Sequence, residues 1–227
     1  MVYNGLTPAE FTPVETSGDA GDFLYIGMLR DLKGPDLFIE ALYIIRLKSG
    51  TAPSAHIVGE GPDEERYRRL VSSLGLEKSI TFHGALPASE AFRLAHTVVV
   101  PSRAEAMPYI ILETVAAQRP LIATRVGGIP VVFGKYAGRL IEPGHIGKLT
   151  VAMENALSEP ERMSADAREL RNCLAETFSV ELMSARITTL YQELKGLKPQ
   201  EVSVSAAQET VTARNRPQSV YTRSSNR

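Results

Sequence analysis

The stretch Pro101–Pro120, PSRAEAMPYIILETVAAQRP, leads from an apolar run through a polar elbow into a helix. Pro108 suits the first helical turn, where a missing N–H costs nothing. Two carboxylates bracket the turn, because Glu105 lies in the elbow and Glu113 lies about two helical turns into the helix. Open α/β sheets bind ligands at such strand-to-helix elbows, and the free N–H groups of a first helical turn attract anions. This segment is therefore the first candidate for a binding site.

Short apolar strands alternate with helices around this segment. We expect strands at residues 23–26, 55–58, 79–82, 98–100, 121–124 and 139–141. We expect helices at residues 36–47, 63–74 and 88–95, then the central helix and a short one after Gly127-Gly128, and only helices from His145 to Lys195. Continuous apolar strands separated by helices favour a parallel sheet. The predicted fold class is α/β: a Rossmann-like, roughly six-stranded parallel sheet with helices on both faces, followed by C-terminal helices.

The ends of the chain differ from its middle. Residues 1–21 carry the Asn-Gly, Pro and Ser-Gly signals of a linker. Residues 22–195 carry the alternating pattern and are expected to form the domain. Residues 196–227 are rich in Ser, Thr, Gln and Arg and poor in apolar periodicity, so we expect a disordered tail.

The composition excludes several classes of protein. The formal net charge of −1 gives no basic field for nucleic acid, and the single cysteine, Cys173, rules out an internal disulfide. No apolar run approaches the roughly 18 residues that span a bilayer. The start, MVYNGLTPAEF, lacks the basic region and apolar core of a signal peptide. We therefore expect a cytoplasmic protein, and a position at the inner face of the membrane through a partner stays open.

Several familiar site motifs are missing. No G-x-G-x-x-G follows a strand, and GGIPVVFGKY departs from a P-loop in spacing and by Tyr136. The four histidines are dispersed and have no metal-ligand spacing. Glycines do follow successive predicted strands, namely Gly27, Gly59, Gly84 and Gly127-Gly128. Their recurrence suggests a shared crevice at one edge of the sheet.

Four segments in this order resemble one known family: GEGP, FHGALP, PSRAEAMPYIILE and RPLIATRVGGIPVV. Together they are similar to the C-terminal, donor-binding domain of retaining glycosyltransferases of the GT-B fold, family 4 or "group 1". The hallmark Glu-x7-Glu corresponds to Glu105 and Glu113, although Ala106-Met107 replace the usual Gly-Phe. The resemblance covers about residues 2–194.

The resemblance implies a role for each matching residue. Glu113 would accept hydrogen bonds from ribose hydroxyls, and Glu105 would lie beside the transferred sugar. The segment after Glu105 would reach sugar hydroxyls or phosphate through its backbone; it comprises Met107, Pro108, Tyr109 and Ile110. The segment Gly84 to Leu86 would touch the base through its backbone, and Gly27 and Gly59 would border the ligand.

The resemblance also implies a basic pair in the first loop, G-R-x-x-x-x-K-G, which neutralises a pyrophosphate. Lys33 is in place, Met28 holds the arginine position, and Arg30 follows two residues later. The implied catalytic residues are thus Glu105, Lys33 and Arg30, without a metal or other cofactor. A solvated surface lysine and plain helix carboxylates remain the structural alternatives for Lys33, Glu105 and Glu113.

Three functions stay open. The favoured one is the donor-binding half of a retaining enzyme that moves a sugar from a nucleoside-diphosphate sugar to a glycan or lipid-linked acceptor, as in polysaccharide biosynthesis. The start of the chain, MVYNG, resembles the family's V-x-Y-N-G junction, so the resemblance implies that the N-terminal acceptor domain is absent. The second is a nucleotide-sugar-binding fragment that needs a partner chain. The third is a different Rossmann-like enzyme, such as an epimerase or a dehydrogenase.

Overall fold

The computed structural model of the chain describes residues 5–175 and 177–195. Residues 6–179 form one compact unit, and helix α8 (Val180–Leu194) belongs to a second unit that we describe by itself. The predicted tail, residues 196–227, lies outside the described residues. Among the described helices, none combines the length and the apolar character that a membrane span requires.

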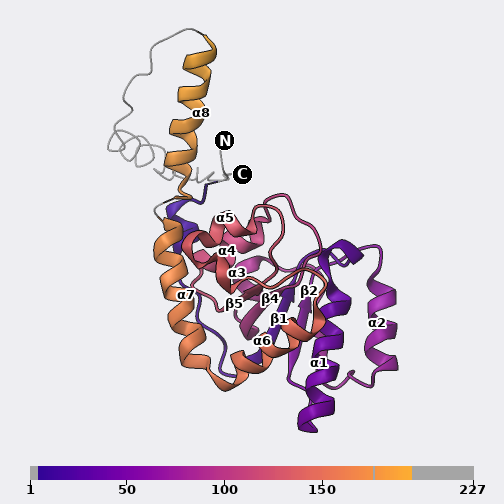
Figure 1. Cartoon of the computed structure of the whole chain (residues 1–227). Coiled ribbons are helices and arrows are strands. Elements are labelled where there is room, and N and C mark those ends of the chain that lie inside the picture. The colour runs from indigo at the N-terminus through magenta and orange to yellow at the C-terminus, as the bar shows by residue number, and fades with distance from the viewer. Residues whose placement is uncertain (1–4, 176, 196–227) are drawn as a thin grey trace, which may run out of the picture. The chain divides into compact units, whose positions relative to one another are not determined.

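The compact unit is built on a parallel sheet of five strands (Figure 1). The strands are β1 (Gly21–Ile26), β2 (Ala55–Val58), β3 (Ile80–Phe82), β4 (Ala95–Val100) and β5 (Leu121–Ala123). Their order across the sheet is β3-β2-β1-β4-β5, and every pairing is parallel. The chain therefore winds outward in opposite directions from β1 and β4. Ligands of such folds bind where the order reverses, outside the carboxyl ends of these two strands.

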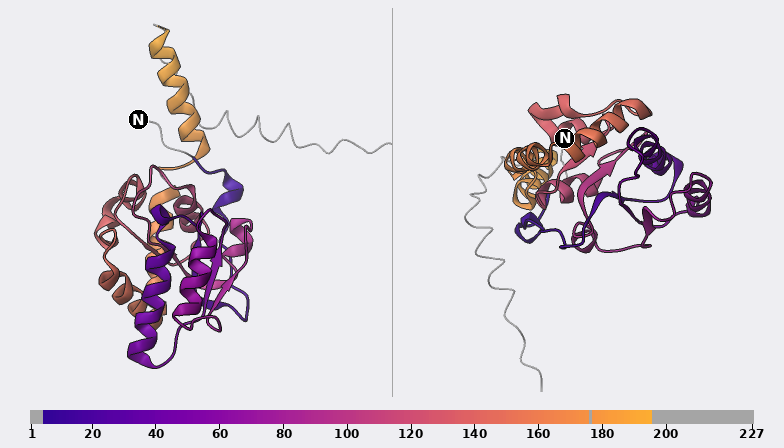
Figure 2. Two further views of the ribbon diagram at one scale, coloured as in Figure 1. Left: turned by 90° about the vertical axis from the view of Figure 1, so that its right-hand side faces the viewer. Right: turned by 90° about the horizontal axis from the view of Figure 1, so that it is seen from below.

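Helices lie on both sides of the sheet (Figure 2). The α-helices are α1 (Pro35–Ser49), α2 (Glu64–Ser73), α3 (Ala88–Ala91), α4 (Tyr109–Ala116), α5 (Ile129–Phe133), α6 (Ile146–Ser158) and α7 (Pro160–Ala175). Three 3-10 helices connect them: η1 (Pro8–Phe11), η2 (Asp31–Lys33) and η3 (Gly134–Arg139). Helix α1 packs against α2 and α6, and α4 packs against α7. The predicted Rossmann-like architecture is confirmed.

The central strands are buried on both faces, as their unbroken apolar sequence requires. Consecutive β1 residues Phe23, Leu24 and Tyr25 are each at most 2% exposed, and Val98 and Val99 of β4 are fully buried. Helix α1 adds a buried face at helical spacing that includes Phe38 and Leu42. These residues form the core that holds the loops at the strand ends in place.

The sixth predicted strand, residues 139–141, is not a strand. Arg139 ends the 3-10 helix η3, and only Ile141 joins the sheet, through a single parallel bridge to Thr124. Pro143 follows two residues later and has no N–H to donate to a longer ladder. The sheet thus has one strand fewer than expected.

The helix predicted at residues 88–95 is also shorter than expected. Helix α3 ends at Ala91, and Ala95 already pairs with Gly21 as the first residue of β4. Alanine favours a helix by propensity, but pairing with the central strand decides the outcome here.

Helix α8 lies within the region from His145 to Lys195 that was predicted to contain only helices. None of its residues is buried. Four large apolar side chains are exposed on it: Ile187, Leu190, Tyr191 and Leu194.

Candidate functional site

A cavity of about 270 Å³ lies where β1 and β4 end. The last residues of these two strands, the loops that follow them and the start of α4 line it: Tyr25, Ile26, Gly27, Met28, Lys33, Val100, Ser102, Glu105, Pro108, Tyr109 and Ile110. This is the position at which the strand order reverses. The cavity therefore occupies the place where an open α/β sheet is expected to bind a ligand.

Lys33 and Glu105 form an ion pair in this cavity. The Lys33 ammonium donates to Glu105 Oε2 over 2.6 Å, and Ser102 Oγ donates to Glu105 Oε1 over 2.8 Å. The carboxylate side chain is only 6% exposed, whereas that of Lys33 is 30% exposed. An ammonium has three donors, so Lys33 keeps hydrogens for an anion while it holds Glu105.

The loop after β4 packs against Gly127 and Gly128, which follow β5. Gly127 has a φ of +52°, and a Cβ there would lie 1.8 Å from the backbone oxygen of Glu105. Gly128 N–H donates to the carbonyl of Ala106 over 2.6 Å. The loop that follows β5 thus sets the backbone position of Glu105, and only glycine fits at residue 127.

The loops carrying Lys33 and Glu105 are joined by Arg103. Its Nη1 donates to Asp31 O over 2.7 Å and to Asp36 Oδ1 over 2.8 Å, and its Nη2 donates to the second oxygen of Asp36. Although burial acts to raise it, the hydrogen bonds and charge of Arg103 hold the pKa of the Asp36 carboxyl below its usual value. Arg103 N–H also donates to Leu32 O over 2.9 Å. The two loops therefore behave as one structural piece.

Helix α4 places a second polar group beside the cavity. Tyr109 lines the cavity, and its hydroxyl lies 3.3 Å from Glu10 Oε1. Glu113, one turn further along α4, is half-buried. Burial raises the pKa of Glu113 above its usual value, and the negative charge of Glu10 adds to the rise. The two oxygens of this partly buried carboxylate can accept hydrogen bonds from hydroxyl groups of a ligand.

The structure brings six of the predicted site residues into the cavity wall: Gly27, Lys33, Glu105, Pro108, Tyr109 and Ile110. The other six do not line it: Arg30, Gly59, Gly84, Leu86, Met107 and Glu113. Arg30 is exposed at the start of η2, and Met107 turns its side chain toward Gly128. Among these six, Glu113 shares helix α4 with the cavity wall.

The glycines that follow β1, β2 and β3 lie together at one end of the sheet, and of the glycines predicted to border a crevice only Gly27 lines the cavity. Gly59 N–H donates to Gly84 O over 2.7 Å, and a Cβ on Gly59 would lie 1.9 Å from Gly27 O. Gly59 also has a φ of +131°, which side chains rarely tolerate. The ends of β1, β2 and β3 are therefore in backbone contact.

Sequence reasoning missed three residues of the site: Tyr25, Ser102 and Arg103. Tyr25 lines the cavity and donates from its hydroxyl to Met28 O over 2.9 Å, which ties down the loop after β1. Burial raises the pKa of Tyr25 well above its usual value, so the hydroxyl keeps its proton. Ser102 and Arg103 stand within three residues of Glu105, and that proximity was the available signal.

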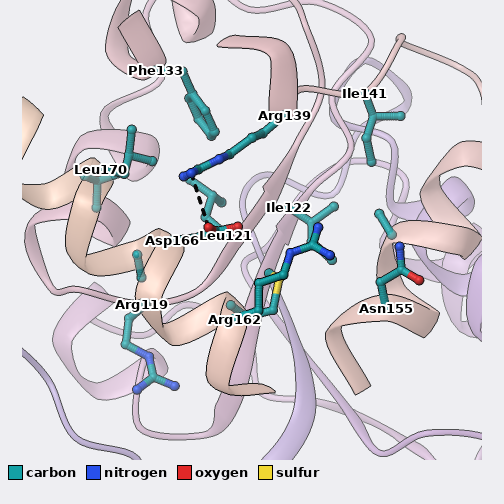
Figure 3. A pocket seen from close by; sticks show the side chains of 14 residues that line it. Arg119, Leu121, Ile122, Phe133, Arg139, Ile141, Asn155, Arg162, Asp166 and Leu170 are labelled. Carbon is teal, nitrogen blue, oxygen red and sulfur yellow. Dashed lines mark ion pairs between the residues drawn. The ribbon is translucent and has the colours of Figure 1, made fainter. Parts of the chain in front are cut away.

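A second, largely apolar cavity of about 240 Å³ lies elsewhere, beside β5, α6 and α7 (Figure 3). Arg139 and Asp166 form an ion pair of 3.2 Å at its wall. None of its lining residues is a predicted site residue. Within residues 5–175 and 177–195, no three His, Cys, Asp or Glu side chains are placed to hold a metal ion together.

Comparison with known proteins agrees with the resemblance seen in the sequence. The family model described as "Glycosyl transferases group 1" matches residues 8–171. The chain belongs to this family. The matched range holds all five strands and the Lys33–Glu105 pair of this group 1 glycosyl transferase domain.

One relative of this group 1 glycosyl transferase chain is a D-inositol 3-phosphate glycosyltransferase of Gordonia bronchialis. It is 29% identical over 208 residues, which are 85% of this chain and 45% of the relative. The chain therefore spans less than half the length of this relative.

Two solved structures share the fold of this group 1 domain. Anabaena HepE, in complex with UDP and glucose, has a TM-score of 0.70 and 18% identity, covering 86% of this chain and 56% of that one. The C-terminal domain of a group 1 glycosyl transferase from Francisella tularensis has a TM-score of 0.65 and 22% identity, covering 78% of this chain and 100% of that one. At these identities the likeness concerns the fold.

Proposed function

We propose that this chain is the donor-binding half of a glycosyltransferase that uses a nucleoside-diphosphate sugar. The observation that carries the proposal is the Lys33–Glu105 pair, 2.6 Å apart in a cavity at the β1/β4 switch point. Lys33 would bind the diphosphate, because an ammonium next to a phosphate stabilises the charge that develops on a leaving group. The start of α4 would add its free N–H groups. The Anabaena neighbour, solved with UDP and glucose, supports this reading of the fold.

We assign the remaining contacts from the chemistry of each group. Glu105 would lie against the transferred sugar, and the half-buried Glu113 would accept hydrogen bonds from ribose hydroxyls. Arg30 is exposed and lies two residues from Met28, so it would assist Lys33 only after moving toward the cavity. Transfer would proceed with retention of the anomeric configuration, as in the family that the motif resembles. No metal is needed in this scheme, because Lys33 and the helix start supply the positive charge.

The acceptor would be a glycan or a lipid-linked sugar, held by an N-terminal domain or partner chain. The chain covers 45% of its Gordonia relative, which leaves room for such a domain. The exposed apolar residues of α8 are suited to contact with another protein surface. With a lipid-linked acceptor, transfer would take place at the inner face of the membrane.

Calorimetric titration of the purified chain with UDP, GDP, ADP and NAD tests the proposal. We expect one nucleoside diphosphate to bind, and Glu113→Ala to weaken its affinity about 10-fold or more. Glu65→Ala is the matched control, because Glu65 is an exposed helical glutamate on α2, away from the cavity. Unchanged affinity in Glu113→Ala would remove the assignment of Glu113. Binding of NAD instead would favour a different Rossmann-like enzyme.

A second candidate is a nucleotide-sugar-binding subunit without turnover of its own. Met28, which is 51% exposed at the cavity wall, favours it, because an arginine is usual at that position in the family that the motif resembles. Met28→Arg would test it: a gain in diphosphate affinity without any sugar hydrolysis or transfer is the expected result. Turnover by the unaltered chain alone would rule this candidate out.

A further inference from the structure

A polar cavity of about 340 Å³ lies at the amino ends of β4 and β5. Its walls come from the start of β4, the turn between α4 and β5, and helix α7, and they include Arg119, Arg168, His96, Gln118, Ser164 and Glu15. All strands of the sheet are parallel, so this cavity and the candidate site lie at opposite ends of the strands. The volume is roughly ten times the ~30 Å³ that a water molecule occupies in the liquid. The cavity therefore has room for a small ligand.

Arg119 brings a charge into this wall without a counterion. Its side chain donates from Nη1 to Val14 O over 3.1 Å, and from Nη2 to Ala95 O and His96 O over 2.7 and 2.9 Å. The residue is only 8% exposed, and its Nε is buried without a hydrogen-bond partner in the described structure. Among the residues that the structure describes, no carboxylate forms an ion pair with Arg119. Buried charges are normally paired, so this guanidinium calls for an explanation.

Arg119 lies between two cavities. The residue lines both this cavity and the apolar one beside β5. Figure 3 shows its guanidinium turned away from the other side chains that line the apolar cavity. Burial lowers the pKa of Arg119 below its usual value, and the charge of Glu15 only partly offsets this. An anion in the polar cavity would remove the cost of the isolated charge.

The rest of the wall adds donors and little negative charge. Arg168 is exposed on α7, and no ion pair holds it in the residues that the structure describes. His96, Gln118 and Ser164 supply further polar groups. Glu15 is the one carboxylate in the wall, and it is exposed to solvent. Two arginines against one screened carboxylate leave a net positive wall.

We propose that this polar cavity binds a phosphate-sized oxyanion, either inorganic phosphate or the phosphate group of a small metabolite. The exposed Arg168 would donate to the oxygens of the anion. The buried Arg119 would attract the anion through its charge and not through a direct contact, because its Nε is buried and its Nη groups are bound to backbone carbonyls. Guanidinium groups suit phosphate because their planar donors match its oxygens. The site is separate from the Lys33–Glu105 cavity, so it stands whether or not the proposed transferase activity is correct.

Thermal unfolding and calorimetry of the whole chain test the proposal with two probes, sodium phosphate and glycerol 3-phosphate. Sodium chloride at equal ionic strength and free glycerol are the controls. We expect saturable binding and a rise in Tm with phosphate groups, and neither with the controls. Binding of glycerol 3-phosphate alone would identify a phosphorylated metabolite as the ligand, whereas comparable binding of both would identify the phosphate group as the recognised part.

Variants decide where the anion binds. Arg168→Gln should leave the fold intact and weaken binding about 10-fold or more, because it removes a charge-assisted contact. Arg69→Gln, an exposed arginine on α2 outside the cavity, is the matched control and should bind as the unaltered chain does. Lys33→Ala should also bind as before. The proposal fails if neither probe binds, or if Lys33→Ala abolishes binding while Arg168→Gln preserves it.

Discussion

Arg103 donates hydrogen bonds to both carboxylate oxygens of Asp36. Arg103 follows β4, and Asp36 lies 67 positions earlier, in the first turn of α1. The contact joins the loop that carries Lys33 to the loop that carries Glu105. Arg103 does not line the cavity, so we regard it as a positioning residue.

We expect Arg103→Ala to lower the free energy of unfolding by about 1–3 kcal/mol, because it removes charge-assisted hydrogen bonds from a half-buried carboxylate. It should also weaken nucleoside-diphosphate binding, since the Lys33 loop loses its anchor. Arg103→Lys keeps the charge without the planar fork and should recover only part of the affinity. Denaturant unfolding and calorimetry measure the two effects. A purely structural role would leave the affinity of the folded protein unchanged.

We expect Lys33→Ala to weaken nucleoside-diphosphate binding about 10-fold or more and to leave nucleoside binding nearly unchanged. The reason is that Lys33 would contact only the diphosphate part of the ligand and not the nucleoside. Lys78→Ala, at an exposed lysine before β3, is the matched control. Calorimetric titration with the nucleoside and its diphosphate separates the two contributions. Equal loss for both ligands would argue that the variant distorts the cavity.

We expect Glu113→Gln to stabilise the protein at pH 7, by on the order of 1 kcal/mol or less. The folded pKa of Glu113 is raised above its ordinary value of 4.5, chiefly by burial. The fold therefore disfavours the ionised form, and the stability present below about pH 4.5 is lost as the pH rises through the folded pKa. Denaturant unfolding at pH 7 and pH 4 checks this. An advantage that is equal at both pH values would contradict it.

We expect Gly127→Ala to destabilise the fold by about 1–3 kcal/mol and to weaken nucleotide binding. The backbone there has a φ of +52°, and the new methyl would meet the Glu105 carbonyl. Gly138→Ala serves as the control, because nothing lies within 4 Å of a Cβ at that position. Thermal unfolding of both variants, with and without nucleotide, measures the difference. Similar behaviour of the two would mean that the Glu105 loop adjusts freely.

We expect removal of divalent metals with EDTA to leave nucleoside-diphosphate affinity unchanged within about 2-fold, because Lys33 and the start of α4 would supply the positive charge. Titration before and after chelation checks this. Restoration of a lost affinity by Mg²⁺ or Mn²⁺ would contradict the metal-free scheme.

Local sequence signals predicted much of this structure. The apolar runs of β1 and β4 predicted these two strands, and the helical spacing after Pro108 predicted α4. The predictions failed where pairing or local turns overrode propensity, at Ala95 and at residues 139–141. Motif resemblance led to Lys33 and Glu105, but no local pattern connected Arg103 with Asp36.

The sequence by itself determined the order of strands and helices and the residue types at the strand ends, because periodicity and glycine placement are local properties. Only the tertiary structure decided which of those residues meet. Lys33 and Glu105 are 72 positions apart, and they become neighbours because β1 and β4 pair at the centre of the sheet. The unpaired charge of Arg119 likewise appears only when α4, β4 and the segment before β1 are packed together. Contacts of this kind depend on register and packing across the whole sheet, which short-range patterns do not encode.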